Sequence, residues 1–412
     1  MADAQRLYSG SVSRHARAGR TDVNPIHPIY VSMAPTIFEH MSALAKAHGA
    51  INLGQGFPDD PPHPDMVAAV ARAIREKSNQ YPPAFGLPEL RAAICDFYRR
   101  RQGLALSTDQ VVVTSGATEA LAAAILTLVK EGDEVLLFQP AYDSYAPMIR
   151  RAGGTPVSIH LRPPDWRYDA EQLAAAITPR TRLLILNDPL NPAGKVASEA
   201  ELAMIADTCI RHDLIAICDE VWEDVRFDGL PHRSLLAMAG MAERAVKIGS
   251  AGKIFGLTGW KTGWLCASGD LAQALGRAHQ FLTFTTPPAL QWAVAEGLGQ
   301  SDDWFAPQHR RWAASREQLS RGLDVAGFVV LPGAATWFLC VDLAASGIAI
   351  SDRDFSERAV REAGVATIPV SALWEGEGPR HILRLCFTKD GPTIDAAVER
   401  LKRFRETVRE TP

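Results

Sequence analysis

The chain has 412 residues, of which 47% are hydrophobic, so it can bury more than one core and two or three domains are expected. Its 43 basic and 47 acidic side chains give a net charge of −4, which indicates neither a nucleic-acid partner nor a basic membrane-binding surface. The longest apolar runs, such as residues 120–129, are far shorter than the ~20 residues of a membrane-spanning helix, so no membrane segment is expected.

The first 60 residues combine an irregular arm with one helix. We interpret residues 1–35 as a flexible arm, because this basic and proline-punctuated stretch lacks the apolar core of a secretory signal; a transit peptide is the alternative. A helical apolar pattern begins at Thr36 and is followed by INLGQGFPDDPPHP, which predicts a short strand and a long loop. Loops of that length inside a compact domain are commonly functional.

The middle of the chain alternates helices with short apolar strands. Helices are predicted over residues 66–77, 87–101, 119–129, 169–177 and 198–212. Strands are predicted over residues 111–114, 134–138, 156–161, 183–186, 214–218, 245–248 and 264–267. Because these strands are continuous apolar runs rather than alternating ones, they predict a mostly parallel sheet covered by helices on both faces, which is a three-layer αβα sandwich.

The last hundred or so residues show a different pattern. A long helix over residues 304–323 is followed by predicted strands at 328–331, 336–341, 365–368 and 382–387. We expect a smaller α+β domain there, completed by residues from the other chain end. The predicted domains are the arm 1–35, a small domain made of 36–60 and 305–412, and a large domain over 61–304.

The six cysteines are scattered, mostly in apolar runs and without a CxxC pair. This distribution indicates buried, reduced thiols and a cytoplasmic protein rather than a disulfide framework. The eleven histidines show no metal-ligand spacing, so no metal site is expected.

One glycine-rich stretch, residues 249–263 (GSAGKIFGLTGWKTG), carries a lysine in its middle. Small neighbours let Lys253 lie where the backbone approaches a ligand, and a desolvated amine is a nucleophile toward carbonyl carbon. A surface turn with solvated lysines is the alternative interpretation.

Other polar residues follow the ends of predicted strands, the edge at which open α/β sheets bind ligands. The small residues of TSGAT suit an anion cradle at a helix N-terminus, or an ordinary turn. The GxGxxG motif does not occur, which disfavours a nicotinamide dehydrogenase.

Four further residues each have a ligand-binding and a structural interpretation. Asp219 could pair with a buried cation such as a protonated pyridine nitrogen, or cap a helix. Asn191 could donate to a ligand oxygen or shape a turn between prolines. Tyr142 could stack on an aromatic ligand or fill the core. Arg384, inside an apolar strand, requires an anionic partner, either a ligand carboxylate or a structural ion pair.

Taken in order, the segments SGAT, PAYDSY, NDPLNP, CDEVW, SAGK, GWK and HILRLCF resemble those of the fold-type I pyridoxal-phosphate aminotransferases. The chain looks most like the class I/II branch that contains kynurenine, glutamine and methionine aminotransferases, and it shares INLGQGFP, NQYPPAFG and HQFLTF with that branch. The resemblance covers residues 30–405. It implies transamination between an amino acid and a 2-oxo acid, with pyridoxal 5′-phosphate as cofactor.

The resemblance implies a role for each matched residue around the cofactor ring. Lys253 matches the lysine that forms a Schiff base and later moves the substrate proton, and Asp219 matches the carboxylate paired with the pyridine nitrogen. Asn191 matches the residue that bonds the ring oxygen, and Tyr142 matches the ring that stacks on the cofactor.

The same resemblance assigns the phosphate contacts. The phosphate would be held by the backbone of Gly116 and Ala117 and by the side chains of Ser250 and Lys261. Tyr81 matches a tyrosine that reaches the phosphate of the neighbouring subunit, which implies a homodimer.

On the substrate side, Arg384 matches the arginine that holds the α-carboxylate, while Asn191 and Gly56 match contacts near the substrate. Phe38 and Phe284 favour aromatic or neutral substrates, such as methionine, glutamine, phenylalanine or kynurenine, over aspartate.

The clearest departure from the family pattern is Trp222, at a cofactor-binding position where the family usually has tyrosine. Indole offers one N–H donor and no hydroxyl. We predict that the Schiff base of Lys253 therefore has a higher pKa than is usual for the family.

Two alternative functions use the same residues. The first is β-elimination from cysteine conjugates, which starts from the same carbanion as transamination. The second is a non-catalytic binding protein that kept the fold, which the presence of Lys253, Asp219 and Arg384 disfavours.

Overall fold

The computed structural model of the chain describes residues 27–409, and the chain divides into two units, Met1–Ala34 and Pro35–Pro412. The described part of the first unit contains helix α1 (Pro28–Ser32), which corrects the prediction of a wholly irregular arm. Proline at the first helical position presets the backbone, and the His27 ring accepts the amide hydrogen of Ile29 at 3.3 Å. Residues 1–26 of the predicted arm lie outside the described residues.

The second unit is organised around a seven-stranded sheet with the order β2-β8-β7-β6-β5-β3-β4. Its strands are β2 (Val111–Thr114), β3 (Glu134–Gln139), β4 (Thr155–His160), β5 (Thr181–Asn187), β6 (Ile215–Asp219), β7 (Ala245–Ser250) and β8 (Gly263–Cys266). Strand β8 runs antiparallel to β2 and β7, and the other neighbouring strands are parallel. The prediction of a mostly parallel sheet is confirmed, and each strand lies within two residues of its predicted limits.

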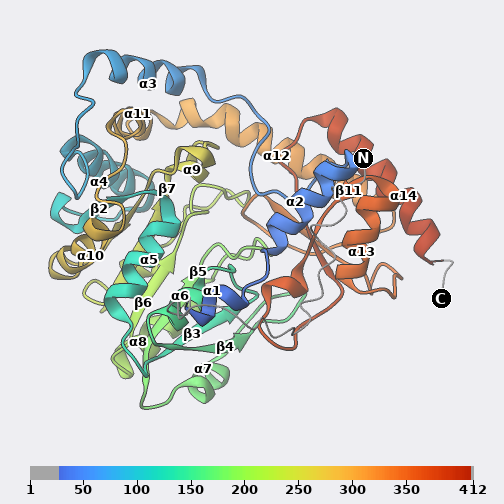
Figure 1. Cartoon of the computed structure of the whole chain (residues 1–412), viewed down its shortest axis with the longest axis horizontal. Coiled ribbons are helices and arrows are strands. Elements are labelled where there is room, and N and C mark those ends of the chain that lie inside the picture. The colour runs from blue at the N-terminus through green and yellow to red at the C-terminus, as the bar shows by residue number, and fades with distance from the viewer. Residues whose placement is uncertain (1–26, 410–412) are drawn as a thin grey trace, which may run out of the picture. The chain divides into compact units, whose positions relative to one another are not determined.

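Both faces of this sheet are buried under helices. Along β3, Val135 and Leu137 pack into one apolar cluster with α5, whereas Leu136 and Phe138 pack into a second cluster with α4 and α8. This alternation is the reason that the strands read as continuous apolar runs. Figure 1 shows α5 crossing in front of the strands. The helices of this part are α3 (Pro64–Glu76), α4 (Pro88–Gln102), α5 (Gly116–Leu128), α6 (Tyr145–Arg151), α7 (Ala170–Ala176), α8 (Glu199–Arg211), α9 (Ala251–Ile254), α10 (Gly269–Leu282) and α11 (Pro288–Leu298).

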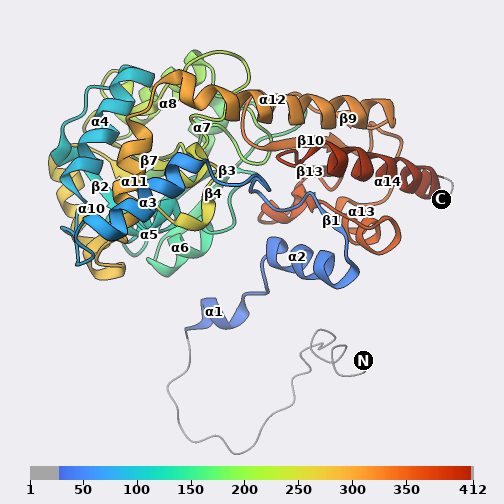
Figure 2. The ribbon, with the colours of Figure 1, turned by 90° about the horizontal axis from the view of Figure 1, so that it is seen from above.

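A smaller C-terminal domain follows the long helix α12 (Asp302–Val325), which in Figure 2 runs toward α14. It contains a four-stranded antiparallel sheet in the order β12-β13-β10-β9. Its strands are β9 (Val329–Val330), β10 (Phe338–Asp342), β12 (Ile368–Pro369) and β13 (Ile382–Cys386), and its helices are α13 (Asp352–Arg358) and α14 (Gly391–Arg409). Helix α2 (Ile37–His48) is followed by β1 (Ile51–Asn52), which pairs in parallel with β11 (Val365–Ala366). A segment near the start of the chain therefore pairs with one from the C-terminal domain, while the exact domain limits stay a prediction.

The single strand predicted over residues 365–368 is wrong. The structure has two short strands there, β11 and β12, which belong to different sheets. Thr367 lies between them, and its hydroxyl is 3.0 Å from the buried Ser356 hydroxyl. This contact satisfies a polar group where the chain changes partner strands.

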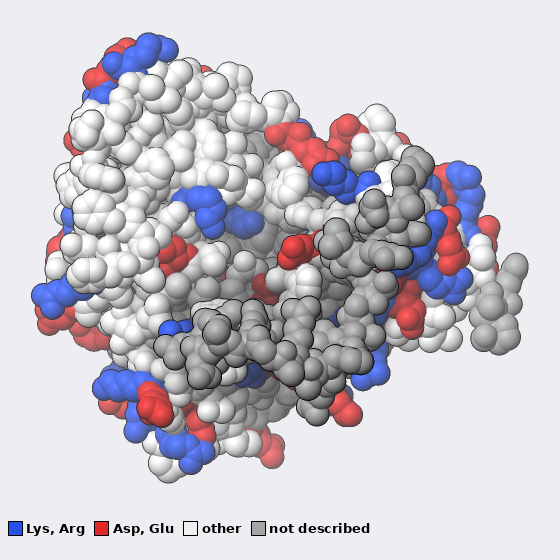
Figure 3. All heavy atoms as spheres, viewed as in Figure 1, with Lys and Arg blue, Asp and Glu red and all other residues white. Residues whose placement is uncertain are grey.

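Charged side chains of both signs are interspersed on the face shown in Figure 3. Within residues 27–409, no helix has the length and apolar character that a bilayer crossing requires. All six cysteines are buried and unbridged.

Candidate active site

The polar residues predicted at the strand ends line one pocket at the carboxyl edge of the large sheet. The pocket is bounded by the start of α5, the loop after β3, the ends of β5 and β6, and the segment from β7 to β8. It brings together nine of the predicted cofactor residues, namely Gly116, Ala117, Tyr142, Asn191, Asp219, Trp222, Ser250, Lys253 and Lys261.

Asp219 ends strand β6 and faces the pocket with a carboxylate that is only half satisfied. Tyr145 donates its hydroxyl to Oδ2 at 2.5 Å, whereas Oδ1 is buried and has no hydrogen-bond partner among the described residues. No helix begins at this residue, so the helix-cap interpretation is wrong. Burial raises the pKa of Asp219, while the Tyr145 hydrogen bond, the nearby backbone N–H of Val221 and the charge of Lys253 act in the opposite direction. A buried acceptor without a partner is costly, and a protonated ring nitrogen would satisfy it.

Two asparagines connect this carboxylate to the rest of the pocket. Asn187 donates its side-chain amide to the Asp219 carbonyl at 2.9 Å and accepts the Asn191 backbone N–H at 2.8 Å. The Asn191 side-chain oxygen accepts from Arg384 Nη1 at 3.1 Å. With that oxygen engaged, the amide nitrogen is the group that Asn191 can offer to a ligand.

Arg384 lies in β13 beside the pocket and is almost completely buried. Nη2 donates to the Gly54 carbonyl at 2.6 Å, so both of its hydrogen-bond partners are uncharged. The guanidinium lies 3.9 Å from the ring centroid of Phe338 and 4.8 Å from that of Phe38. Burial lowers the pKa of Arg384 to about 10, which leaves a cation at neutral pH. Among the described residues, the carboxylate of Asp143 is near enough to favour the charged guanidinium but does not bond it, so a ligand carboxylate can take the direct contact.

An anion site forms where α5 begins. Gly116 has φ +75°, and the Lys261 ammonium lies 3.5 Å from the position that a Gly116 side chain would occupy. A side chain at Gly263 would lie 2.8 Å from the Ala117 backbone nitrogen, so glycine keeps this approach open. The Ser250 hydroxyl does not cap α9. A helix N-terminus, a hydroxyl and an ammonium therefore converge as a phosphate site requires.

Lys253 lies in the short helix α9 with its amine in the pocket. Burial lowers the pKa of Lys253 to about 8; Arg384 and Lys261 act in the same direction, and Cys386 and Asp219 in the opposite one. A substantial fraction of this amine is therefore neutral near physiological pH and can act as a nucleophile or a base.

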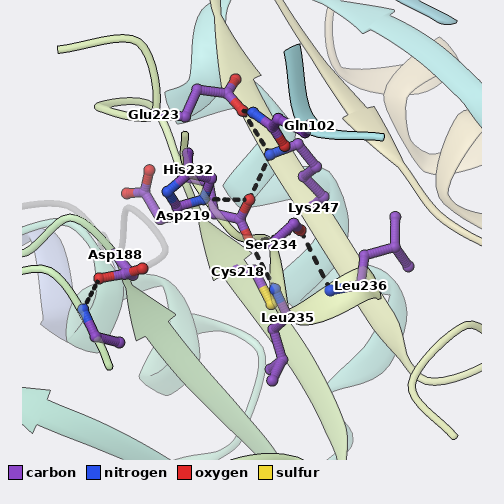
Figure 4. Close-up of polar contacts among 12 residues, drawn as sticks. Gln102, Asp188, Cys218, Asp219, Glu223, His232, Ser234, Leu235, Leu236 and Lys247 are labelled. Carbon is purple, nitrogen blue, oxygen red and sulfur yellow. Dashed lines mark hydrogen bonds and ion pairs between the residues drawn. The ribbon is translucent and has the colours of Figure 1, made fainter. Parts of the chain in front are cut away.

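Next to Asp219 in the chain, Glu220 belongs to a buried charged cluster with Glu223, His232 and Lys247, the last three of which are labelled in Figure 4. Glu220 contacts Lys247 and, at 2.9 Å, His232 Nε2, while Lys247 also bonds Glu223 at 2.5 Å. The carboxylates and the imidazole lie close enough to hold a metal ion, but the Lys247 ammonium already bonds both carboxylates. The cluster therefore anchors the end of β6 to β7.

Two predicted site residues lie elsewhere. Tyr81 is 81% exposed and Phe284 is 42% exposed, and their rings make an edge contact at 5.2 Å. Neither lines the pocket of its own chain. Gly56 lies beside the Phe338 ring on which Arg384 packs, and a side chain at Gly56 would lie only 2.8 Å from that ring.

Sequence reasoning missed Tyr145, Trp337, Phe338 and Gly54. Tyr145 follows Tyr142 by three residues in PAYDSY, and a turn closed by the Tyr145 N–H on the Tyr142 carbonyl brings the two rings to 5.7 Å at the start of α6. Trp337 and Phe338 belong to the apolar run WFLCV, which gives no signal beyond core packing.

Residues 48–401 match the family model of aminotransferase class I and II. The chain belongs to this family. It is 39% identical to the methionine aminotransferase of Escherichia coli K12 over 90% of this chain and 96% of that one. It is 35% identical to kynurenine–oxoglutarate transaminase 1 of Rattus norvegicus over 88% of this chain and 94% of that one. The solved structure of N-succinyldiaminopimelate aminotransferase from Mycobacterium tuberculosis superposes with a TM-score of 0.88 at 41% identity, covering 92% of this chain and all of that one.

The aminotransferase is therefore an enzyme that uses pyridoxal 5′-phosphate. The pocket fits this cofactor on its own geometry. The unpartnered Asp219 oxygen suits the ring nitrogen, the α5 N-terminus with Lys261 suits the phosphate, and Lys253 suits the aldehyde.

Proposed function

We propose that this aminotransferase transfers the α-amino group of an aromatic or neutral amino acid to a 2-oxo acid, with Lys253 as the catalytic amine. The observation that carries the proposal is a pocket that holds an amine and a half-satisfied carboxylate, with the buried guanidinium of Arg384, whose hydrogen-bond partners are uncharged, beside it. Within this pocket, bound cofactor supplies the electron sink for a carbanion at the substrate Cα.

The residues of the chain position the reacting groups. Lys253 takes the proton from the substrate Cα and later gives it back. It can do both because its lowered pKa lets the amine exist in its neutral and in its protonated form. Asp219 would accept the ring N–H of bound cofactor and so favour the protonated nitrogen. Asn191 would donate to the ring oxygen, Tyr142 would pack on the ring face, and Arg384 would fix the α-carboxylate of the substrate.

The phosphate contacts would come from the backbone of Gly116 and Ala117 and from Ser250 and Lys261. We further propose a homodimer in which Tyr81 completes the neighbouring site, since this exposed aromatic ring has no role in its own pocket. Light scattering of the purified chain measures this directly, and a monomer that retains full activity contradicts the shared site. Six buried thiols favour the cytoplasm as the location.

The substrate class follows from the rings around Arg384. Phe38 and Phe338 flank the guanidinium and offer apolar contact to a substrate side chain. The cations that line the described pocket, Lys253 and Lys261, belong to the aldehyde and phosphate ends. Related proteins are named for three different substrates, methionine, kynurenine and N-succinyldiaminopimelate, so their names do not select one. The preference for neutral and aromatic donors therefore rests on the rings around Arg384.

A half-reaction screen tests the proposal. The cofactor-loaded enzyme is mixed with each amino acid in turn, and loss of visible absorbance reports transfer of the amino group to the cofactor. We expect methionine, glutamine, phenylalanine and kynurenine to respond more strongly than aspartate. A response confined to acidic amino acids contradicts the substrate class, and no response with any amino acid contradicts transamination itself. Pyruvate release from a cysteine conjugate without a 2-oxo acid identifies β-elimination instead.

A further inference from the structure

Two indole rings cover the Lys253 amine. The Nζ atom lies 4.7 Å from the ring centroid of Trp222 and 5.1 Å from that of Trp337. Both distances are inside the ~6 Å range in which an ammonium is attracted to an aromatic face. Trp222 follows β6 of the large sheet and Trp337 precedes β10 of the small one, so each domain contributes one wall.

The rings are held firmly by aromatic packing. They meet edge to face at 5.0 Å, Trp337 packs at 5.3 Å on Trp312 of α12, and Trp222 packs at 5.3 Å on Phe338. Edge-to-face pairs of this kind fix ring orientation. The two faces therefore keep their positions beside Lys253 without any hydrogen bond to the amine.

The buried indole of Trp337, like those of Trp312 and two other tryptophans, leaves its N–H group without a partner among the described residues. A phenyl ring would fill much of the same space without a stranded N–H group. Indole presents the most electron-rich face of the aromatic side chains to a cation, which is a reason for its presence here.

We propose that Trp222 and Trp337 form an aromatic cage that stabilises the protonated amine of Lys253, with Trp337 as a positioning residue of the reaction. Four other groups act on this amine. Arg384 and Lys261 disfavour the ammonium form, and Asp219 and Cys386 favour it. The cage adds to the second pair.

The cage differs from those groups in being uncharged and unable to accept a proton. Asp219 is already bonded by Tyr145, and its free oxygen is committed to the ring nitrogen once cofactor binds. The indole faces keep their effect in that state. A proton taken up by Lys253 can therefore stay on its amine in this buried pocket, because neither indole ring accepts it. This catalytic consequence rests on the proposed function, whereas the stabilisation of the ammonium form does not.

Competitive labelling measures the protonation of Lys253 without substrate or turnover. Full-length, cofactor-free protein is treated with trace acetic anhydride from neutral to alkaline pH, and mass spectrometry follows acetylation of the peptide that contains Lys253. We expect Trp222→Phe and Trp337→Phe to move the midpoint of the curve to lower pH by a few tenths of a unit. Trp337→Leu, which removes the aromatic face, should move it by about one pH unit.

Trp312→Phe is the matched control. Trp312 is also buried and touches Trp337, but its ring does not contact the Lys253 amine. Because phenylalanine keeps an aromatic ring against Trp337, this substitution should alter thermal stability and leave the midpoint unchanged. Circular dichroism verifies that each variant folds. If Trp337→Leu does not fold, Trp222→Phe and Trp337→Phe still decide the test.

Unchanged midpoints in folded Trp222→Phe and Trp337→Phe, or an equal shift in Trp312→Phe, overturn the cage. The proposed transamination can fail independently, through a negative amino acid screen with the wild-type enzyme. A shifted midpoint then still supports the cage around Lys253.

Discussion

The buried cluster that contains Glu220 allows a quantitative prediction from Lys247→Met. Lys247 is fully buried in β7, and its ammonium bonds Glu220 and Glu223. Methionine fills a similar volume but carries no charge. The substitution leaves two buried carboxylates with His232 as the one remaining basic partner of Glu220 in the described cluster.

The magnitude follows from the pKa of Glu220. Burial alone would raise it, but Lys247 and His232 together lower it from 4.5 to about 2. At about 1.4 kcal/mol per pKa unit, this corresponds to ~3 kcal/mol of stabilisation. Removing one partner of a buried ion pair costs about 3–5 kcal/mol in other proteins. We therefore expect Lys247→Met to lower the free energy of unfolding by ~3–5 kcal/mol, measured by urea denaturation of the cofactor-free chain.

The deficit should also depend on pH. In the wild type, the lowered pKa of Glu220 gives stability that is complete above its ordinary value of 4.5 and is lost only as pH falls toward 2. The pKa of Lys247 is raised above 10.5, so its contribution persists through neutral pH. In the variant, burial without the Lys247 charge raises the folded-state pKa of Glu220, and the folded protein takes up a proton. Its deficit should shrink as pH falls from about 8 to about 5.

An exposed ion pair supplies the control. Arg211 and Asp207 form an i,i+4 pair on α8 with side chains 60% and 59% exposed. Arg211→Met should cost about 0.5 kcal/mol or less. If Lys247→Met costs no more than Arg211→Met, or if its deficit is the same at pH 8 and pH 5, the ion pairs of the buried cluster do not stabilise the fold.

Four further substitutions test the active site. Lys253→Ala should fold with an unchanged circular dichroism spectrum and lose transamination, and near-normal turnover would overturn the assignment of the catalytic amine. Arg384→Lys should raise KM about 10–100-fold with a smaller change in kcat, because the bidentate guanidinium is lost; an unchanged KM argues against carboxylate binding there. Tyr145→Phe removes the donor to Asp219 and should weaken cofactor binding about 3–10-fold in a fluorescence titration, whereas equal affinity means that this hydrogen bond does not position the carboxylate. Trp222→Tyr restores a hydroxyl near the ring oxygen and should lower the pKa in a visible-absorbance titration of the loaded enzyme, and an unchanged pKa counts against the predicted effect of Trp222.

The large sheet could be predicted because the signal for each of its strands lies within the residues of that strand. Most of its strands are buried along nearly their whole length, so their continuous apolar runs identify them and indicate a mostly parallel sheet, whereas nothing in the runs marks β8 as the antiparallel strand. The split of residues 365–368 into β11 and β12 could not be predicted, because it depends on two partner strands that are distant in sequence. Helix α1 was missed because five residues, begun by Pro28 and capped by His27, are too short for apolar periodicity.

The same distinction applies to the site. Lys253, Asp219 and Arg384 are polar residues in apolar or glycine-rich surroundings, which makes each visible on its own. Lys247 has that signal as well, in the run AVKIG, but its partner Glu220 is identified only by the register that pairs Cys218 with Lys247. Trp337 carries no signal, since its role depends on a contact with an amine in the other domain.

Asp219 and Glu220 show how one strand can serve both chemistry and stability. The backbone stays extended past β6, because Glu220 N–H donates to the Ile248 carbonyl at 3.1 Å. Successive side chains of an extended strand point to opposite faces. Asp219 therefore faces the pocket, and Glu220 faces Lys247 and His232. The ion cluster fixes the residue next to the cofactor carboxylate without adding charge to the pocket itself. A change that loosens the cluster should weaken cofactor binding in proportion to the order lost at the end of β6, even though none of its side chains lines the pocket.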